Sequence, residues 1–599
     1  MTVTTIEPLR AAAGSCGLVA GDPARIAEIS PTRPDGDTLA VIRAGQKIYV
    51  LRITPQAGPC VACLGGFLLS QEAPGYVGPA TVAADEAAAM IEAAVPPGGW
   101  AVLLEAIALL TEPDVENLAV VDLTDGTLIQ RSLPVRTRCQ ACGPHGAPTD
   151  DVELACDETL APGSSHLTGA LPQGLQRAFV GAHTVFKHPL LELDGPVTAA
   201  QVGVPLLDGS LEPGVGRTES VASANDVAVL EALERYAGLY HSHPQSQVTA
   251  TLASLGDAAI DPATLGYLRP EVYEHHGDRF QMLQPDEAIQ WVPVRSLVDG
   301  SRRFLPERAL YWAWRVSRDR ALFADTSSGF ALGASIGDAV LNGLLEVIER
   351  DSFLLAWHRR LALPRLDLGH GAPRSLQQLV ARAELFLRAV FQIYWCTLDT
   401  GVPTVIALAR SIDEDGPQQV LSAGSGLTLA SAVSSSVREA AAIFSAVKVT
   451  YPQEAERVDR MVDDLSLVDT MMDHCMLGSR RSSTPWFAFL TDGSGGVAPY
   501  DQVAERDIWQ PSLVDTVAGI TEQLASAGLE AFAANVTTDE LAWKGLAAAR
   551  VVVPGTLPIT FGYELGRVHS LPRLTEATLP FPAQVAPSEF TSAPPHPFP

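Results

Sequence analysis

Two short segments of the sequence repeat one arrangement of acids and a base: residues 230–236 read LEALERY, and residues 345–351 read LEVIERD. Side chains three and four positions apart lie on one face of an α-helix, so each Glu-x-x-Glu-Arg motif predicts a charged stripe. The stripes contain Glu231, Glu234 and Arg235 in the first segment and Glu346, Glu349 and Arg350 in the second. Converging carboxylates would suit Mg²⁺, which prefers oxygen ligands and often bridges to the phosphates of a nucleotide.

We expect the two helices at about residues 224–240 and 336–361, starting at the capping patterns Ser223-Ala-Asn-Asp226 and Ser335-Ile-Gly-Asp338. Most other side chains of both helices are apolar, which indicates buried helices whose carboxylates need arginine or metal partners. Two alternatives remain open. Either motif could be an intrahelical Glu–Arg pair on a solvated face. A glycosidase-like acid pair is also conceivable, because the sequence does not fix the distance between carboxyl groups.

Four of the eight cysteines form two Cys-x-x-Cys pairs, GPCVACL with Cys60 and Cys63, and TRCQACG with Cys139 and Cys142. Eight cysteines in 599 residues are too few for a disulfide scaffold. Paired thiolates at this spacing favour a structural Zn²⁺ site closed by four sulfur ligands, whereas one pair alone could be a redox pair. We therefore expect these four cysteines to hold structural zinc.

The bulk composition excludes several classes of partner. With 47% hydrophobic and 18% charged residues, the chain has the composition of a globular protein with large cores. Its formal charge of −28 leaves no basic surface for nucleic acid. Neither a signal-like start nor an apolar run long enough for a membrane helix is present, so we expect a cytoplasmic protein without a membrane partner.

The pattern along the chain predicts an α+β fold in two domains. Strand-like alternation at 38–54 and a helical pattern at 79–94 indicate a smaller α/β domain at residues 1–160. A stretch rich in Pro, Gly and Ser predicts a linker at 161–175. Residues 176–599 are expected to form a mixed α/β domain, with further helices at 374–391 and 430–447 and strands at 403–409 and 550–553.

Three longer segments resemble the nucleotide-binding blocks of the YcaO family, in particular those of its SagD-like, azoline-forming cyclodehydratases. They are GVGRTESVASANDVAVLEALERY at 214–236, TSSGFALGASIGDAVLNGLLEVIERD at 326–351 and LASAVSSSVREAAA at 429–442. The resemblance implies a YcaO-type mixed α/β catalytic domain that binds ATP and Mg²⁺. It assigns the metal and phosphate contacts to Glu231, Glu234, Glu346, Glu349 and Glu439, with Arg235 and Arg350 beside them.

The resemblance also implies a reaction. In this family a Cys, Ser or Thr side chain of a peptide attacks the preceding backbone carbonyl. ATP then phosphorylates the resulting oxyanion, and loss of phosphate leaves a thiazoline or oxazoline. The expected substrate is therefore a ribosomally synthesised precursor peptide of a thiopeptide-like natural-product pathway.

The sequence ends in PHPFP, residues 595–599, which resembles the Pro-x-Pro-x-Pro end of many azoline-forming members of the family. In those proteins the segment reaches into the active site, which implies a catalytic role for Pro595, Pro597 and Pro599. A carboxylate at Pro599 is a candidate proton acceptor, because repeated proline keeps the ordering cost of the segment low. From the residues alone, the segment would be interpreted as a disordered tail.

The two Cys-x-x-Cys pairs resemble the zinc loops of the ubiquitin-activating-enzyme-like (ThiF-like) domain that often precedes YcaO in these enzymes. No GxGxxG phosphate loop accompanies them, so we expect residues 1–160 to be a docking module. The N-terminus leaves little room for a peptide clamp, which predicts a separate leader-peptide-binding, ThiF-like partner protein. A downstream azoline dehydrogenase and a second copy of the chain, in a homodimer, are the other expected partners.

The three blocks also depart from the family pattern. Val227 stands where Ser is usual, Ala334 where Asn is frequent and Ala442 where Gln is common. These losses leave open a non-catalytic scaffold that binds peptide or another maturation enzyme. Thioamide formation, by the same activation with sulfide as nucleophile, is a third hypothesis.

Overall fold

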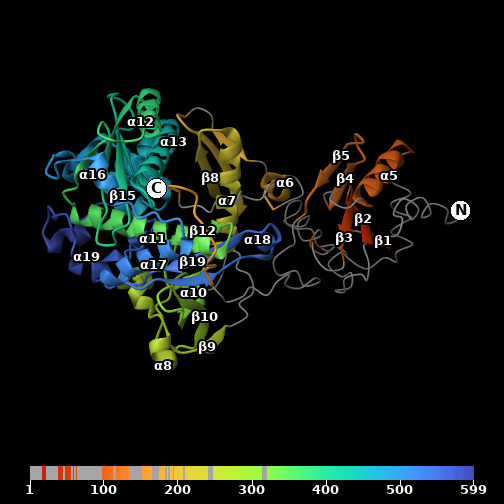
Figure 1. The fold of residues 1–599 in the computed structure, drawn as a ribbon, viewed down its shortest axis with the longest axis horizontal. Helices are drawn as coiled ribbons and strands as arrows, with labels where there is room; N and C mark the ends of the chain where they lie inside the picture. Colours follow the sequence, from red (N-terminus) through yellow and green to blue (C-terminus); the bar gives the residue numbers. More distant parts are fainter. Residues whose placement is uncertain are drawn as a thin grey trace. The chain divides into compact units, whose positions relative to one another are not determined.

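A computed structural model gives the fold (Figure 1) and describes residues 17–21, 38–44, 47–54, 59, 63, 97–111, 117–133, 152–164, 174–181, 185–186, 189–192, 195–206, 210–239, 247–312 and 320–598. The chain divides into two compact units. The first consists of Met1–Ala147, Pro172–Pro189 and Thr538–Gly545, and the second of Pro148–Leu171, Leu190–Thr537 and Leu546–Pro599. The helix predicted at 79–94 lies outside the described residues, and the domain limits at 160 and 175 stay a prediction.

The first unit is built on a five-stranded sheet, in the order β1 (Gly17–Gly21), β2 (Thr38–Ala44), β3 (Lys47–Ile53), β4 (Leu118–Asp122) and β5 (Leu128–Arg131). The alternation at 38–54 is confirmed, because β2 and β3 pair as an antiparallel hairpin. Period-two alternation gives the sheet two apolar faces. One face packs under helix α5 (Pro97–Thr111), and the other forms a second small core that includes Tyr49, Leu51 and Val120.

The described part of the second unit contains three sheets, and the strands of each sheet lie side by side in the following order. The largest has β11 (Arg302–Pro306), β10 (Ile289–Ser296), β18 (Phe532–Asn535), β19 (Ala547–Val552) and β12 (Phe330–Gly333), with β9 (Val248–Ala250) beside β10. The second has β16 (Gln419–Ser425), β15 (Thr404–Ser411), β14 (Ala389–Trp395), β13 (Arg365–Asp367) and β17 (Val497–Pro499). The smallest has β6 (Leu190–Glu192), β7 (Thr198–Pro205) and β8 (Leu211–Thr218).

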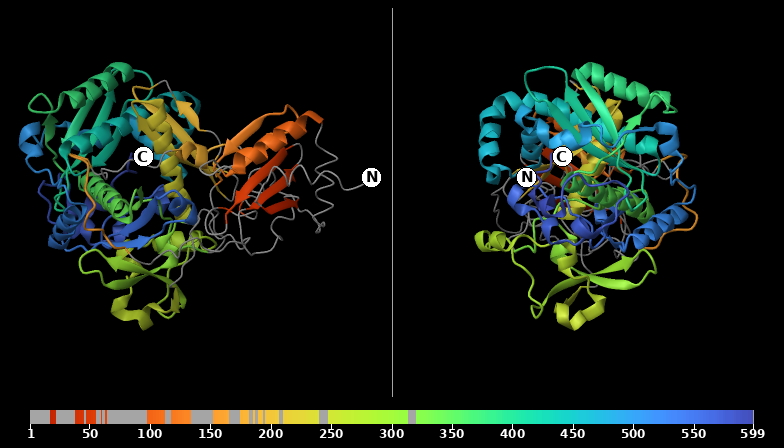
Figure 2. Two further views of the ribbon diagram at one scale, coloured as in Figure 1. Left: turned by 45° about the vertical axis from the view of Figure 1, so that its right-hand side comes forward. Right: turned by 90° about the vertical axis from the view of Figure 1, so that its left-hand side faces the viewer.

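Helix α11 (Ile336–Arg359) runs through the middle of the second unit, between the sheet of β12 and β19 and the sheet of β15 (Figures 1 and 2). Its first half shares a core with β19 and helix α17 (Leu513–Ser526), and its second half packs on β14, β15 and β16. The predicted cap is confirmed, since the side chain of Ser335 accepts a hydrogen bond from the backbone N–H of Asp338. The predicted burial of this helix is also confirmed.

Helix α7 (Val221–Leu239) lies on β8, and glycines make the close approach possible. A Cβ at Gly216 would lie within 1.9 Å of the carbonyl oxygen of Ala224, where no side chain fits. The predicted cap of this helix is wrong. Ser223 lies inside the helix, and its backbone N–H donates to the hydroxyl of Ser220, three residues earlier.

Two further helices cover the outer face of the β15 sheet: α12 (Arg374–Leu387) and α13 (Leu429–Asp463). The prediction of α12 to residue 391 is too long, because Arg388 adopts a left-handed conformation with φ of 52° and β14 begins directly after it. The prediction of α13 is too short, since the helix continues past an exposed Pro452. The strands predicted near 403–409 and 550–553 are confirmed as β15 and β19.

Together these elements give the mixed α/β architecture that the sequence predicts. Among the described residues, no helix combines the length and the apolar character that a bilayer-spanning helix needs.

Candidate active site

Helices α7, α11 and α13 and strand β8 meet around one cavity of about 1120 Å³ in the second unit. The charged residues from these elements that line it are Glu212, Arg217, Glu231, Glu234, Arg235, Asp338, Glu346, Arg350 and Glu439. Two motifs more than a hundred residues apart in the sequence therefore face one space, as the sequence predicts. Glu349 is next to the cavity, where its carboxylate accepts a hydrogen bond from the backbone N–H of Ser425 at 2.7 Å.

On α7, Glu231 is held at both carboxylate oxygens. One oxygen accepts from the backbone N–H of Val215 at 3.0 Å, and the other pairs with Arg235 one turn later. Arg235 also binds Glu212 of β8 at 2.8 Å. On α11, Arg350 pairs in the same way with Glu346 at 2.8 Å and donates to the hydroxyl of Ser328.

The intrahelical Glu–Arg alternative is therefore right about the pairs and wrong about their setting. Both pairs connect residues i and i+4, as a surface pair would. Both helices are packed on sheets, however, and the pairs line a cavity in the second unit instead of a solvated face. The effect of the pairing is to hold each arginine in a fixed place at the wall.

Burial raises the pKa of three carboxyl groups at the site, and neighbouring negative charges add to the effect. The pKa of Glu349 rises to about 8, through burial first and the charge of Glu439 second. Burial and the charges of Glu346 and Glu231 raise the pKa of Glu234 well above its ordinary value, and burial also raises that of Glu439. When ionised, the carboxyl groups of the site therefore carry more negative charge than Arg235 and the neighbouring arginines neutralise.

The donor set fits a divalent cation bound to phosphates. Carboxylate oxygens are the ligands that Mg²⁺ prefers, and a bound cation would stabilise the charged forms of carboxyl groups whose ionisation is opposed mainly by burial. Among the described residues, the buried Nε atoms of Arg235 and Arg350 have no hydrogen-bond partner, so neither guanidinium group has used all of its N–H donors. Among the described residues, no three Asp, Glu, His or Cys side chains are already placed to hold a metal ion.

Comparison with known proteins identifies the family. Residues 215–557, more than half of the chain, match the sequence profile of a family described as YcaO cyclodehydratases, ATP- and Mg²⁺-binding. The chain belongs to the YcaO family. A relative from Methanothermobacter thermautotrophicus, an uncharacterised protein, is 23% identical over 367 residues, which cover 59% of this chain and 86% of the relative.

Two solved structures are similar to the chain over most of its length. A heterocyclase in complex with substrate and cofactor has a TM-score of 0.70 at 19% identity, covering 96% of this chain and 82% of that one. The heterocyclase TruD has a TM-score of 0.58 at 17% identity, covering 93% of this chain and 73% of that one. At these identities the likeness concerns the fold, and it confirms the predicted mixed α/β class.

In this YcaO protein, residues 594–598, which we call the proline-rich segment, pack against other parts of the second unit, to which they belong. The indole N–H of Trp357 on α11 donates to the carbonyl of Pro594 at 2.9 Å. The ring of Phe598 packs on Phe353 of the same helix, with 4.6 Å between centroids. Pro595 and Pro597 are buried, so the disordered-tail interpretation is wrong for these two. Pro599 lies outside the described residues, and its catalytic role stays a prediction.

A buried ionic cluster behind Arg350 was not predicted. The carboxylate of Asp325 accepts from Arg550 at 2.8 Å and from Arg567 at 2.9 Å. Arg550 also donates to the backbone carbonyl of Ser328, whose hydroxyl binds Arg350. One signal was available, because a single arginine in the apolar strand at 550–553 needs a buried anionic partner. The partner itself could not be identified, since it lies 225 positions away.

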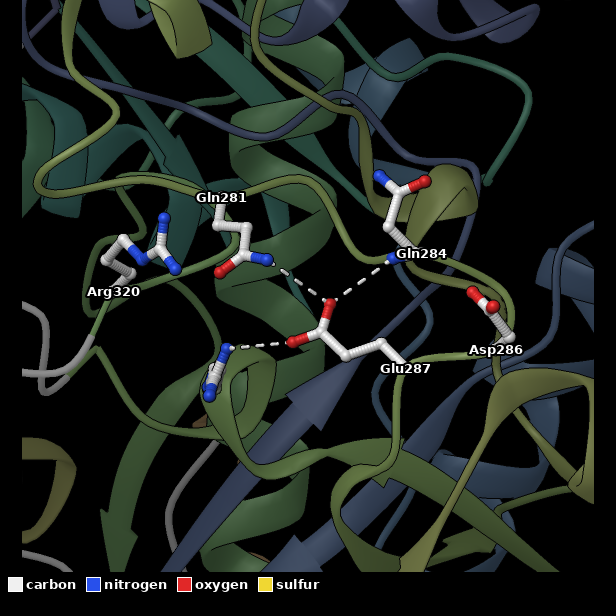
Figure 3. Close-up of a pocket in the computed structure, with 6 residues that line it drawn as sticks. Gln281, Gln284, Asp286, Glu287 and Arg320 are labelled. Atoms are coloured by element: carbon white, nitrogen blue, oxygen red, sulfur yellow. Dashed lines mark hydrogen bonds and ion pairs between the residues drawn. The ribbon is translucent and has the colours of Figure 1, made fainter.

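A second hollow, drawn in Figure 3, has a different character. It measures about 640 Å³ and is lined by Gln281, Gln284, Asp286, Glu287, Arg308 and Arg320. The carboxylate of Glu287 already accepts from the side chain of Gln281 and the backbone N–H of Gln284, and it pairs with Arg308 (Figure 3). None of the family motifs contributes to this hollow, so we place the chemistry at the cavity of α7 and α11.

The predicted zinc ligands lie almost entirely outside the described residues. This holds for Cys60, Cys139 and Cys142, whereas Cys63 is described and buried. The four-sulfur zinc site therefore stays a prediction.

Proposed function

We propose that this protein is an ATP- and Mg²⁺-dependent cyclodehydratase that forms thiazolines or oxazolines in a ribosomally synthesised precursor peptide. The observation that carries the proposal is the group of partly buried carboxyl groups, with raised pKa values, beside two arginines that Glu231 and Glu346 hold at the cavity wall. Such a set suits a cation bound to nucleotide phosphates. The cavity of about 1120 Å³ exceeds a typical ligand pocket, which supports two substrates, nucleotide and peptide.

The acids and arginines of the site have different proposed roles. Glu234, Glu349 and Glu439 hold Mg²⁺, because burial raises their pKa values and a cation would stabilise their charged forms. Glu439 also pairs with Arg217 at 3.9 Å. Glu231 and Glu346 orient Arg235 and Arg350 toward the phosphates, through the ion pairs they already make. When bound, Mg²⁺ and ATP supply charge neutralisation and the phosphoryl group that activates the amide oxygen.

The peptide is proposed to lie against the apolar part of the cavity lining that contains Met471, Met472, Phe561 and Leu565. There the sulfur or oxygen of the reacting side chain would lose its proton and form a bond to the preceding carbonyl carbon. The carbonyl oxygen would take the γ-phosphoryl group of ATP, with ADP as the leaving group, and would then depart as phosphate. Loss of the amide N–H proton would leave the C=N bond. The ring product is thus lighter than the peptide by one water.

The proposal is tested with the purified full chain, its partner protein and a Cys-containing precursor. Mass spectrometry should record an ATP-dependent loss of one water mass per ring, and Glu349→Gln should abolish it. Glu522→Gln is the matched control, because it makes the same change on an exposed side chain of α17 and should leave activity unchanged. Normal cyclisation by Glu349→Gln would contradict the assignment of the nucleotide site.

A non-catalytic scaffold is the second candidate, since Val227 and Ala334, two departures from the family pattern, line the cavity. Isothermal calorimetry separates the candidates. Absence of Mg-ATP binding, alone and with precursor and partner, would favour the scaffold. Thioamide formation is distinguished by product mass, because it exchanges oxygen for sulfur.

The remaining assignments concern the subtype and the partners. We propose a SagD-like protein whose residues 1–160 form a ThiF-like docking domain, with zinc held by Cys60, Cys63, Cys139 and Cys142. A leader-peptide-binding partner, an azoline dehydrogenase and a homodimer complete the proposed assembly. Metal analysis of the purified chain should find stoichiometric zinc that Cys63→Ser removes. Absence of zinc from the wild-type chain would contradict the zinc site.

A further inference from the structure

His474 joins three segments that are far apart in the sequence. It belongs to helix α14 (Met471–Ser479) and is 3% exposed. The backbone N–H of Gly562 donates to its Nε2 at 3.1 Å, so Nε2 carries no proton. The proton therefore lies on Nδ1, which donates to the backbone carbonyl of His596 at 2.8 Å. One neutral imidazole thus uses both ring nitrogens to connect α14, the loop at 562 and the proline-rich segment.

The contacts are reciprocal. The ring of His596 stacks on His474 with 4.4 Å between centroids, and its Nε2 donates to the carbonyl of Thr560 at 2.9 Å. Both imidazoles also meet the ring of Phe561 edge-on, at 5.9 Å. The backbone on each side of Phe561 is therefore held by one of the two histidines.

Two of the three segments that His474 joins, α14 and the loop at 562, also line the active-site cavity. Met471 and Met472, one turn before it on α14, line the cavity, and so does Phe561, which precedes Gly562. Gly562 has φ of 97°, a conformation that favours glycine, and an added Cβ would lie 3.1 Å from Leu565, another lining residue. Movement of His474 would thus shift the wall on which the peptide is proposed to lie.

We propose that His474 is a positioning residue, which fixes the peptide-side wall of the cavity and the proline-rich segment relative to each other. This inference rests on the proposed function. The two hydrogen bonds of His474 keep Phe561 and residues 594–598 at a fixed distance from each other. The reacting amide then meets the nucleotide in a single geometry. Such positioning raises kcat more than it raises the affinity for the peptide.

The surroundings keep His474 neutral, as both contacts require. Burial lowers its pKa to about 4, against a smaller opposite effect of its hydrogen bond to His596 and of Asp473. Asp473 is itself paired with Arg457 and accepts from the backbone N–H groups of Asp469 and Thr470. The stacked His596 is also buried, with its pKa lowered well below the ordinary value.

Three substitutions separate the two hydrogen bonds. His474→Asn places an amide N–H near the position of Nδ1 and keeps the donor to His596. His474→Gln places an amide oxygen near the position of Nε2 and keeps the acceptor for Gly562. His474→Phe keeps the ring and removes both. We expect kcat for cyclisation to fall about 100-fold in the Phe variant and about tenfold in each of the others, from roughly tenfold per buried hydrogen bond.

The affinity for Mg-ATP, measured by calorimetry, should stay within about twofold in all three variants, because none of the acids is touched. His358→Phe is the matched control: it removes a partly buried imidazole whose ring nitrogen bonds the carbonyl of Phe590 at 2.8 Å. It should lower stability to a similar extent and leave kcat near the wild-type value. Equal loss of kcat in the control would reduce His474 to a general packing residue and overturn the inference.

Hydrogen exchange at the Gly562 amide gives a readout that needs no activity. Exchange should be fast in the Asn and Phe variants and slow in the wild type and the Gln variant. Protection that does not depend on residue 474 would overturn the inference, as would wild-type kcat in His474→Phe. An inactive wild-type protein with the expected exchange pattern would instead contradict the proposed function.

Discussion

Replacement of Glu349 by Gln tests the electrostatics of the site directly. The side chain belongs to α11, and its Oε2 accepts from the backbone N–H of Ser425. Burial and the negative charge of Glu439 raise its pKa to about 8, while Arg350 and the hydrogen bond from Ser425 act in the opposite direction. Gln has the same shape, can accept the same hydrogen bond and carries no charge at any pH. The substitution therefore isolates the free energy of placing a negative charge at this position.

The magnitude follows from the two pKa values of Glu349. The unfolded chain loses this proton near 4.5, and the folded protein keeps it up to about pH 8. Between those values the unfolded state binds fewer protons, so the free energy of unfolding of the wild type falls as pH rises. At about 1.4 kcal/mol per pH unit, the full difference is about 5 kcal/mol above pH 8 and zero below pH 4.5.

Urea denaturation at about pH 5 and pH 8.5 measures this difference. We expect wild type and Glu349→Gln to be similar in stability at the lower pH, and the variant to be more stable by several kcal/mol at the higher pH. Mg-ATP binding should be lost in the same variant. Glu522→Gln controls for a change of charge on an exposed side chain. Equal pH dependence in wild type and Glu349→Gln would refute the reasoning, because Glu349 would then ionise as freely as in water.

Three other substitutions test how the site is supported. Ser335→Ala removes the cap of α11 and should lower the free energy of unfolding by about 1 kcal/mol, measured by urea denaturation. Asp351→Asn breaks a buried ion pair with Arg573 at 2.7 Å. We expect a loss of about 3 kcal/mol in the same measurement, because the buried guanidinium then keeps only its pair with Asp399, at 2.8 Å. Gly216→Ala puts a Cβ into the carbonyl of Ala224, so β8 must move from α7 and the Kd for Mg-ATP should rise at least tenfold in calorimetry.

Matched substitutions decide what each result means. Asp413→Asn breaks an ion pair with Arg388 that is largely exposed, and it should destabilise the protein much less than Asp351→Asn does. Gly519→Ala, inside α17 with its nearest neighbour 3.7 Å away, should stabilise the protein by about 0.5–1 kcal/mol. A destabilisation by Asp351→Asn no larger than that of Asp413→Asn would contradict the buried ion pair. Unchanged nucleotide affinity in Gly216→Ala would show that nucleotide binding does not need the close spacing of β8 and α7.

The parts of the site that the sequence predicts are those encoded locally. The stripe of Glu346, Glu349 and Arg350 follows from helical geometry, and the start of the helix follows from the cap at Ser335. The apolar residues around them predicted burial, and α11 is buried. The meeting of the two stripes at one cavity was inferred from their common pattern, and packing of α7 and α11 on β12 brings it about.

The parts that the sequence could not predict depend on distant partners. The contact of Glu349 with Ser425 spans 76 positions, and that of His474 with the carbonyl of His596 spans 122. Neither has a periodic signal, since each is fixed only when whole sheets pack. The start of α7 was misplaced for a smaller reason. Several serines near it can cap a helix, and the choice of Ser220 depends on how the chain leaves β8.

The charges of the site also help to decide whether the protein is an enzyme or a non-catalytic scaffold. Val227 and Ala334 replace polar residues of the family at the cavity wall, and they remove neutral contacts only. The acids that remain lower the stability of the folded protein, because burial and mutual repulsion oppose the ionisation of Glu234 and Glu349. A protein without a cation to bind would gain stability by replacing either acid with a neutral residue. The presence of these unneutralised acids beside Arg235 and Arg350 therefore favours a working nucleotide site over a scaffold.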